Sequence, residues 1–288
     1  MKITAVILAA GQGTRMRSAL PKVLHPLAGL PLIEYSLRLA EALTTERPVV
    51  VVGHGAEKVR QAVGERARFA VQQPQLGTAH AVQTAESLLA GEEGLVLVIS
   101  AGMPLFTRPT LENLIEAQQN NGAGPLTMLT MILDDSHGFG RIVRGPDGSV
   151  RAIVEEAQAT PEQMAIRELN VGAYCFAAGW LWAALRRVPL SPKGEYYLTD
   201  VVGLAVADGL KVQAQVVTDT SEAIGINTRV HLAEAETILR GRINTAWMAA
   251  GVTLVDPRTT YIETDVQIGR DCLIYPNTSL RGKTVVGE

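Results

Sequence analysis

The sequence predicts an α/β protein: a Rossmann-like, doubly wound and mostly parallel sheet, then a linker helix, then the start of a left-handed parallel β-helix. Three observations lead to this prediction. Short β-branched apolar runs alternate with helical periodicity, one long amphipathic stretch follows, and branched aliphatic residues then recur at every sixth position. With 288 residues, 47% of them hydrophobic, the chain is long enough to bury a large core.

Strands and helices alternate along the expected first domain, residues 1–228. Strands are expected at residues 3–8, 48–52, 95–99 and 126–132, and helices at residues 32–43, 56–63, 78–89 and 110–119. Glycine-punctuated strands at residues 138–154 and 171–176 indicate a more antiparallel portion, and a helix is expected at residues 198–207. Ligands bind outside the carboxyl ends of the strands in such sheets. The loops expected around one crevice are residues 9–22, 72–78 and 100–105.

A linker helix is expected at residues 229–250. One face of it would carry Leu232, Ala235, Ile238, Leu239 and Ile243. Such a face suits a connector that packs on the first domain, but periodicity alone fits a plain surface helix equally well.

Branched aliphatic residues at positions 262, 268, 274, 280 and 286 follow a strict interval of six. This interval predicts that residues 251–288 begin a left-handed parallel β-helix, in which each aliphatic side chain points into a triangular prism. Only about two turns fit before Glu288, fewer than repeat architectures usually need for stability. The chain is therefore expected to be truncated.

Residues 8–22 combine a tight glycine turn with two separated cations, directly after an apolar strand. Small side chains at residues 9–13 let backbone N–H groups approach phosphate oxygens, and Arg15 and Lys22 add positive charge. A dinucleotide fingerprint would need a third glycine where Met16 stands, and the Gly-Lys-Ser/Thr of a P-loop is absent. The loop therefore indicates a polyphosphate site of another kind, with an ordinary glycine turn as the alternative.

A series of short motifs along the whole chain gives it a family resemblance. The motifs lie at residues 8–15, 21–25, 27–29, 72–80, 138–142, 153–155, 168–170, 194–200 and 225–227. They resemble the signature of the sugar-1-phosphate nucleotidyltransferases. Within that family the pattern is most similar to the bacterial bifunctional N-acetylglucosamine-1-phosphate uridylyltransferases and glucosamine-1-phosphate N-acetyltransferases.

The resemblance implies roles for individual positions. The implied catalytic residues are the cations Arg15 and Lys22. The implied substrate-binding residues are Leu8, Ala9, Ala10 and Gly11 for the nucleotide, Gln72, Gly77 and Thr78 for uracil, Gly140, Glu155 and Asn170 for the sugar, and Ser100, Ala101 and Asn227. Asn227 is also implied as a ligand of Mg²⁺, the one cofactor expected.

One position departs from the family pattern. Where the resemblance implies Gly-Asp before x-Pro-Leu, with the aspartate bound to the metal, this chain has Gly102 in the segment 100–105. Mg²⁺ prefers charged oxygen ligands, so the loss is expected to weaken the metal site severely and leave the fold and the nucleotide pocket intact. Asp134 and Asp135 lie in another loop and are not obvious replacements.

The resemblance implies uridylyl transfer from UTP to N-acetylglucosamine 1-phosphate, which gives UDP-N-acetylglucosamine and pyrophosphate, impaired here by Gly102. It also implies a part in peptidoglycan synthesis, an acetyltransferase half beyond Glu288, and a homotrimer that associates more weakly in this chain. The alternatives are a nucleotidyltransferase for another base or sugar, and a sugar-nucleotide-binding module that no longer catalyses.

Charge, apolar runs and cysteine content exclude other classes of protein. A net charge of -3 gives no basic footprint for nucleic acid. The apolar runs are strand-sized, too short to cross a membrane. Cys175 and Cys272 lie far apart and lack metal-ligand spacing. We therefore expect a cytoplasmic protein without nucleic-acid or membrane partners.

Overall fold

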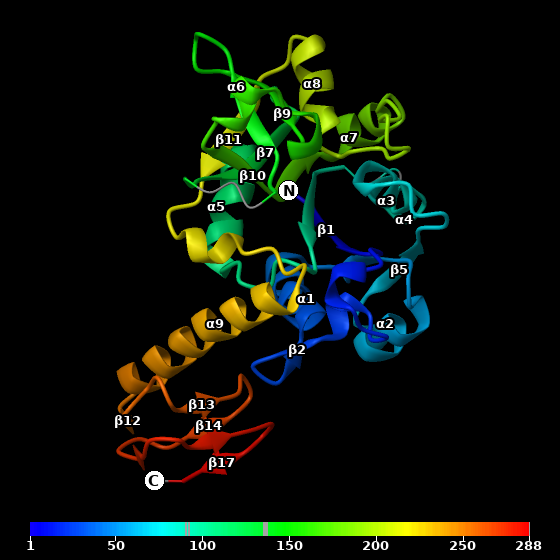
Figure 1. Ribbon diagram of the computed structural model, residues 1–288. Helices are drawn as coiled ribbons and strands as arrows, with labels where there is room; N and C mark the ends of the chain where they lie inside the picture. The colour runs from blue at the N-terminus through cyan, green and yellow to red at the C-terminus, as the bar shows by residue number, and fades with distance from the viewer. Residues whose placement is uncertain (90, 92, 135–137, 288) are drawn as a thin grey trace.

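The structure, a computed structural model, describes residues 1–89, 91, 93–134 and 138–287. A large sheet with its helices forms one end of the molecule, and a long helix, α9, runs from it to a small stack of short strands (Figure 1). The C-terminus lies at the far end of that stack. This arrangement confirms the predicted order of sheet, helix and β-helix.

A mixed sheet forms the centre of the first domain. The order of its described strands is β11 (Val212–Val216), β7 (Leu126–Ile132), β10 (Glu168–Ala177), β6 (Leu95–Ser100), β1 (Ile3–Ala9), β4 (Val49–Val52) and β5 (Arg68–Val71). Neighbouring strands are parallel except at β10, which runs antiparallel to both β6 and β7. Beside β10, β8 (Arg141–Arg144) and β9 (Val150–Val154) form an antiparallel pair. The mostly parallel sheet with an antiparallel portion is therefore confirmed.

Helices cover both faces of this sheet. On one face, buried residues of β1 such as Ile7 share a core with α1 (Leu32–Leu43), α2 (Ala56–Val63) and α5 (Arg108–Gln119). On the other face, Val6 and its neighbours pack with α3 (Thr78–Thr84), α4 (Glu86–Leu89), α7 (Ala178–Leu185) and α8 (Asp200–Ala207). Val6 and Ile7 face opposite ways because successive side chains of a strand alternate. The sheet is doubly wound, as predicted.

The helix expected at residues 78–89 is interrupted. It consists of α3 and α4, which are separated at Ala85. The Thr84 hydroxyl donates to the carbonyl of Ala81 at 2.7 Å, a side-chain bond that competes with the regular helical bonds. The single-helix prediction was therefore wrong at this point, although both pieces lie within the expected residues.

The long helix α9 (Arg229–Ala249) is a connector, which decides between the two interpretations of its sequence. Its first half, with Leu232 and Leu239, packs against a cluster of the first domain that includes Met16. Its second half, with Ile243 and Trp247, packs against the core of the β-helix. The apolar face thus contacts two bodies in succession.

The C-terminal strands form three parallel two-stranded ladders. Their bounds are β12 (Thr253–Leu254), β13 (Tyr261–Ile262), β14 (Gln267–Ile268), β15 (Leu273–Ile274), β16 (Ser279–Leu280) and β17 (Val285–Val286). Ile262 pairs with Leu280 and Ile268 with Val286, three hexapeptides further along. These aliphatic residues share one core, so the prediction from the interval of six is confirmed.

A small hairpin of the first domain contacts the β-helix. It consists of β2 (Pro26–Leu27) and β3 (Leu30–Pro31), which the sequence analysis did not predict. At its tip, the Ala28 carbonyl accepts a bond from the backbone N–H of Thr264 at 3.0 Å, and the Ala28 N–H donates to Glu236 of α9 at 2.8 Å. Hairpin, α9 and β-helix are therefore joined at one point.

Neither described cysteine is part of a disulfide. Cys175 is buried in the core, and this burial raises the pKa of its thiol, so the group is inert. Within the described part of the chain, no helix has the length and apolar character to span a membrane.

Candidate functional site

The loops that follow β1, β5 and β6 meet at one edge of the sheet. The Gln75 side chain donates to the carbonyl of Ala10 at 2.7 Å. The N–H of Ala101 donates to the carbonyl of Leu8 at 3.0 Å. The predicted meeting of these three loops at the carboxyl ends of the strands is confirmed.

The glycine loop holds its two cations on two short turns, Thr14–Met16 and Lys22–Leu24. Gly13 links them: its φ is +63°, and a Cβ there would lie 2.6 Å from the Cβ of Lys22. Glycine is therefore required for the lysine stem to pack against the turn. Met16 is 1% exposed and packs in the cluster that contacts α9, so it anchors the loop where a dinucleotide fingerprint would have glycine.

Lys22 is the centre of charge in this loop. Its ammonium donates to Oδ1 of Asn227 at 3.1 Å, a contact between residues more than 200 positions apart. Burial and, to a smaller extent, the nearby Arg15 together lower the pKa of Lys22 to about 8. Among the residues that the structure describes, neither Arg15 nor Lys22 forms an ion pair. The loop therefore carries positive charge that only a ligand could neutralise.

Gly102 lies directly beside this ammonium. A Cβ at Gly102 would lie 3.0 Å from Nζ of Lys22 and 3.5 Å from Oγ of Ser100. The Gly102 carbonyl accepts a bond from the N–H of Ile226 at 2.8 Å, which brings Asn227 into the same place. The structure therefore gathers the residues implied as metal ligands, but with a lysine ammonium between them.

The donor set does not fit Mg²⁺. Gly102 offers no side-chain oxygen, and the Asn227 Oδ1 already accepts from Lys22. Asp134 pairs with Arg167 at 2.6 Å, while Asp135 lies outside the described residues. No group of three or more His, Cys, Asp or Glu in the described ranges could hold a metal ion. Mg²⁺ is usually held by one or two protein carboxylates together with water and phosphate oxygens, and neither Gly102 nor Asn227 supplies a carboxylate.

The residues implied for uracil shape a tight loop after β5. Gln72 is buried, and its Nε2 donates to the carbonyl of Gly77 at 2.8 Å and lies 3.2 Å from Nδ1 of His80. No described residue donates to its Oε1, so that oxygen is the group left for a ligand. Gly77 has a φ of +97°, and a Cβ there would lie 2.5 Å from the carbonyl oxygen of Tyr196. Only glycine fits there.

Of the residues implied for the sugar, Gly140 directly precedes β8, Glu155 directly follows β9, and Asn170 lies on β10. The Asn170 N–H donates to the carbonyl of Gly140 at 2.8 Å. Its Oδ1 accepts from the Tyr174 hydroxyl at 3.0 Å and from the N–H of Gly172 at 3.1 Å, so the amide group is fixed with its NH₂ left to donate. β10 changes register between Asn170 and Tyr174, which is the irregularity that re-aims this side chain.

One segment joins the uracil and sugar residues. The Thr78 hydroxyl accepts from the N–H of Leu198 at 2.9 Å, and the Thr199 hydroxyl donates to Glu155 at 2.9 Å. Glu155 in turn raises the pKa of Asp200, after the larger effect of burial. Residues 198–199 therefore link the residues implied for uracil to those implied for the sugar.

The sequence analysis missed several residues that organise this site. Gln75 and Thr199 lie in motifs that it identified but to which it gave no side-chain role. Arg229, whose Nε donates to the carbonyl of Met16 at 3.3 Å, carried no sequence signal, because the two residues are far apart along the chain.

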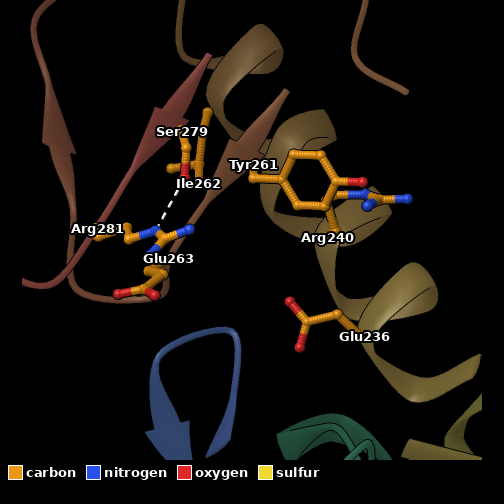
Figure 2. Close-up of a pocket in the computed structure, with 7 residues that line it drawn as sticks. All are labelled: Glu236, Arg240, Tyr261, Ile262, Glu263, Ser279 and Arg281. Atoms are coloured by element: carbon orange, nitrogen blue, oxygen red, sulfur yellow. Dashed lines mark hydrogen bonds between the residues drawn. The ribbon is translucent and has the colours of Figure 1, made fainter. Parts of the chain in front are cut away.

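A separate cavity of about 300 Å³ lies between α9 and the β-helix (Figure 2). Its charged groups are engaged with neighbours: the Arg240 guanidinium lies 4.4 Å from the Tyr261 ring centre, and Arg281 donates to Ser279 at 3.1 Å. Glu236 and Glu263 accept backbone N–H bonds. The cavity is therefore part of the junction between the two bodies and contains none of the predicted site residues.

Comparison with known proteins identifies relatives across the chain. A family described as the MobA-like NTP transferase domain matches residues 5–138, from β1 to the end of β7 and beyond. Proteins named "Bifunctional protein GlmU" match almost the whole chain. Those of Exiguobacterium sibiricum, Shouchella clausii and Geobacillus thermodenitrificans are 48%, 46% and 48% identical over 285, 285 and 289 residues, which is 99%, 99% and 100% of this chain. The chain spans about 63% of the length of these curated relatives.

Proposed function

Because this chain belongs to the family of the bifunctional GlmU proteins, we propose that its first domain is a sugar-1-phosphate nucleotidyltransferase domain. The substrates we propose are UTP and N-acetylglucosamine 1-phosphate, and the products are UDP-N-acetylglucosamine and pyrophosphate. One observation carries the proposal: two cations, Arg15 and Lys22, have no ion-pair partner among the described residues and lie on a glycine loop that is linked by hydrogen bonds to the residues implied for uracil and the sugar.

The chemistry needs positioning and charge neutralisation more than proton transfer. The second pKa of a phosphate monoester is about 6, so the attacking sugar phosphate is already ionised at neutral pH. Its oxygen attacks the α-phosphorus of UTP in line, a new P–O bond forms, and the bond to the bridging oxygen of the leaving pyrophosphate breaks. Arg15 and Lys22 would offset the charge that gathers on the leaving group.

The binding roles follow from the free polar groups. We assign Oε1 of Gln72 to accept from N3–H of uracil, since its NH₂ group is used within the loop. Gly77 lets the base approach the backbone. The free NH₂ of Asn170 and the carboxylate of Glu155 would bind the acetamido group and the hydroxyls of the sugar.

Because Gly102 stands where the resemblance implies an aspartate, we propose that uridylyl transfer by this chain is slow. The resemblance implies a metal-assisted reaction, but the donor set does not fit Mg²⁺, and we route no step through it. The same observation favours a second candidate function, a module that binds the sugar nucleotide without catalysis.

One set of assays tests these proposals. Pyrophosphate release is measured with four nucleoside triphosphates and several sugar phosphates, together with calorimetric binding of UDP-N-acetylglucosamine. We expect Gly102→Asp to raise magnesium-dependent turnover well above that of the parent chain, with metal-free product affinity little changed. Gly102→Asn, the neutral control of equal shape, should not raise turnover. Equal magnesium-dependent rates for the aspartate variant and the parent would contradict the role of Gly102.

The setting of the reaction is also a proposal. We place the protein in the cytoplasm and in the synthesis of UDP-N-acetylglucosamine for peptidoglycan. Acetyl transfer would belong to the part of the relatives that this chain does not span. Copies of the chain would associate as trimers through the β-helix, and weakly where only the two described coils take part.

A further inference from the structure

We infer that the glycine loop of this chain binds polyphosphate without a metal ion, so that Mg²⁺ weakens the binding of a nucleoside triphosphate or of pyrophosphate. The inference rests on the proposed function, because it concerns the same loop. The ionic form that this site prefers is the metal-free polyphosphate anion.

The first argument is the position of Lys22. Its ammonium lies 3.0 Å from the point where a side chain at Gly102 would begin, and it donates to Oδ1 of Asn227. A dication held between residues 102 and 227 would therefore lie next to a positive charge and would have to displace a hydrogen bond. With glycine at 102, no carboxylate compensates for that repulsion.

The second argument is the balance of charge around the phosphate site. Arg15 and Lys22 have no ion-pair partner within the described part of the chain, and Lys22 is partly buried. Cations in such a setting are stabilised most by the ligand with the largest negative charge. Free triphosphate and pyrophosphate each carry more negative charge than their Mg²⁺ complexes. The metal-free forms therefore match this loop better.

The third argument concerns the other donors that could favour the metal complex. The Ser100 hydroxyl accepts from the N–H of Gly102 at 3.2 Å. Glu155, the carboxylate implied for the sugar, accepts from the Thr199 hydroxyl at 2.9 Å. Neither supplies a free anion beside Lys22, so a metal-bound phosphate would gain no protein ligand that the free phosphate lacks.

The test is calorimetric titration of the full chain with inorganic pyrophosphate and with UTP at neutral pH, in EDTA and in millimolar Mg²⁺. We expect both ligands to bind the parent chain about tenfold more tightly in EDTA. Gly102→Asp should reverse the sign, with tighter binding in Mg²⁺. Gly102→Asn, which has the same shape without the charge, should keep the sign of the parent. Circular dichroism melting confirms that both variants fold.

The outcomes separate this inference from the proposed function. Tighter binding of pyrophosphate by the parent in Mg²⁺, or the same sign for both variants, would overturn the inference. The proposed substrates would still stand if UDP-N-acetylglucosamine bound. Conversely, pyrophosphate binding that is tighter in EDTA, without any binding of uridine nucleotides, would support the inference and refute the substrates. A parent chain that binds pyrophosphate in neither buffer refutes the inference.

Discussion

Two regions of this protein are rich in charge but differ in where that charge finds its partner. Where the first domain and α9 meet the β-helix, partners come from the chain itself: Arg38 of α1 pairs with Asp265 at 3.0 Å, and Glu236 of α9 accepts the N–H of Ala28. At the glycine loop, the Lys22 ammonium donates to the neutral Asn227 and has no ion-pair partner among the described residues. The first region therefore contains an ion pair between distant parts of the chain, whereas the Lys22 ammonium of the second has only a neutral hydrogen-bond acceptor among the described residues.

The difference separates residues that hold the molecule together from residues that bind. A charge with a partner on another element fixes the position of the two elements. A partly buried charge without one costs stability and is typical of a site where a ligand completes the pair. Glycine has opposite uses in the two regions. Gly29 makes room for the Glu263 carboxylate at the junction, whereas Gly102 removes a side chain beside Lys22.

The largest expected effect is a loss of stability on substitution of Asn244, which lies at the junction. Asn244 is 2% exposed and donates to the carbonyls of Pro257 and Thr260 at 2.8 and 3.0 Å. Asn244→Ala leaves both carbonyls without that partner, and we expect a loss of about 2–4 kcal/mol in the free energy of unfolding. Thermal melting measures the loss, and calorimetry should show unchanged affinity for UDP-N-acetylglucosamine. A changed affinity would mean that the junction and the site are coupled.

The converse change is Lys22→Met at the glycine loop. Removal of this cation should weaken metal-free pyrophosphate binding by about 10- to 100-fold, because charge-assisted bonds to phosphate are lost. The melting temperature should not fall, because no ion pair among the described residues is broken.

In the Gly102→Asp background, Lys22→Ala or Arg15→Ala should lower turnover at least about tenfold. Lys211→Met, at an exposed position before β11, is the matched control. A change confined to the Michaelis constant for the sugar phosphate would contradict these roles.

Much of the fold was predictable because its signals are local. Apolar runs and helical periodicity located β1, α1, α2 and β7, and the interval of six located the β-helix. β5 and β11 were missed, since Arg68 and the glutamines of β11 make these edge strands look polar. α7 was missed because AGWLWAAL is apolar on nearly every side, which leaves no helical periodicity to detect.

The site was predictable in its members but not in its contacts. The motifs identified the loops, and the rule that ligands bind outside the carboxyl ends of the strands predicted that these loops meet at one edge of the sheet. No local sequence signal predicts the hydrogen bond between Lys22 and Asn227. Nor does one predict that the Lys22 ammonium lies 3.0 Å from the place of a Cβ at Gly102. That contact changes the interpretation of Gly102 from a lost ligand to a site that repels the metal.

A smaller effect, on stability against pH, should come from His25, which connects the two regions. His25 is 2% exposed, ends the turn that carries Lys22, and lies near Arg229 at the start of α9. Burial lowers the pKa of His25 below its ordinary value, and Arg229 lowers it further. The folded protein thus favours the neutral imidazole, while the unfolded chain takes up a proton near pH 6.5. The stability that this difference gives is present above that pH and is lost as the pH falls below it.

The measurement compares melting temperatures of the parent and of His25→Gln at several values between about pH 7 and pH 5. Carboxylates that begin to protonate near the lower limit affect both proteins alike. We expect the melting temperature of the parent to fall more steeply than that of the variant. Parallel curves would show that His25 is not held neutral by the fold.

The smallest expected effect is self-association through the β-helix. Outward-facing residues of the β-helix strands, such as Leu273 and Val285, are 50% and 68% exposed. Two coils can bury far less than the roughly 1,600 Å² of a standard stable interface, so we expect a concentration-dependent mixture of monomer and trimer. Sedimentation over a wide concentration range tests this against a chain that ends at Ala250.

That shorter chain also uncovers Ile243 and Trp247, which pack on the β-helix core, and new apolar surface could itself promote association. The point variant Val285→Lys avoids this problem, because it places a charge on an exposed strand and leaves the core intact. If the β-helix is the assembly element and this strand faces the partner copies, the variant should sediment as a monomer where the parent associates. Equal association of the parent and of both altered chains would locate assembly elsewhere, and the junction would then serve only to hold the two bodies of one chain together.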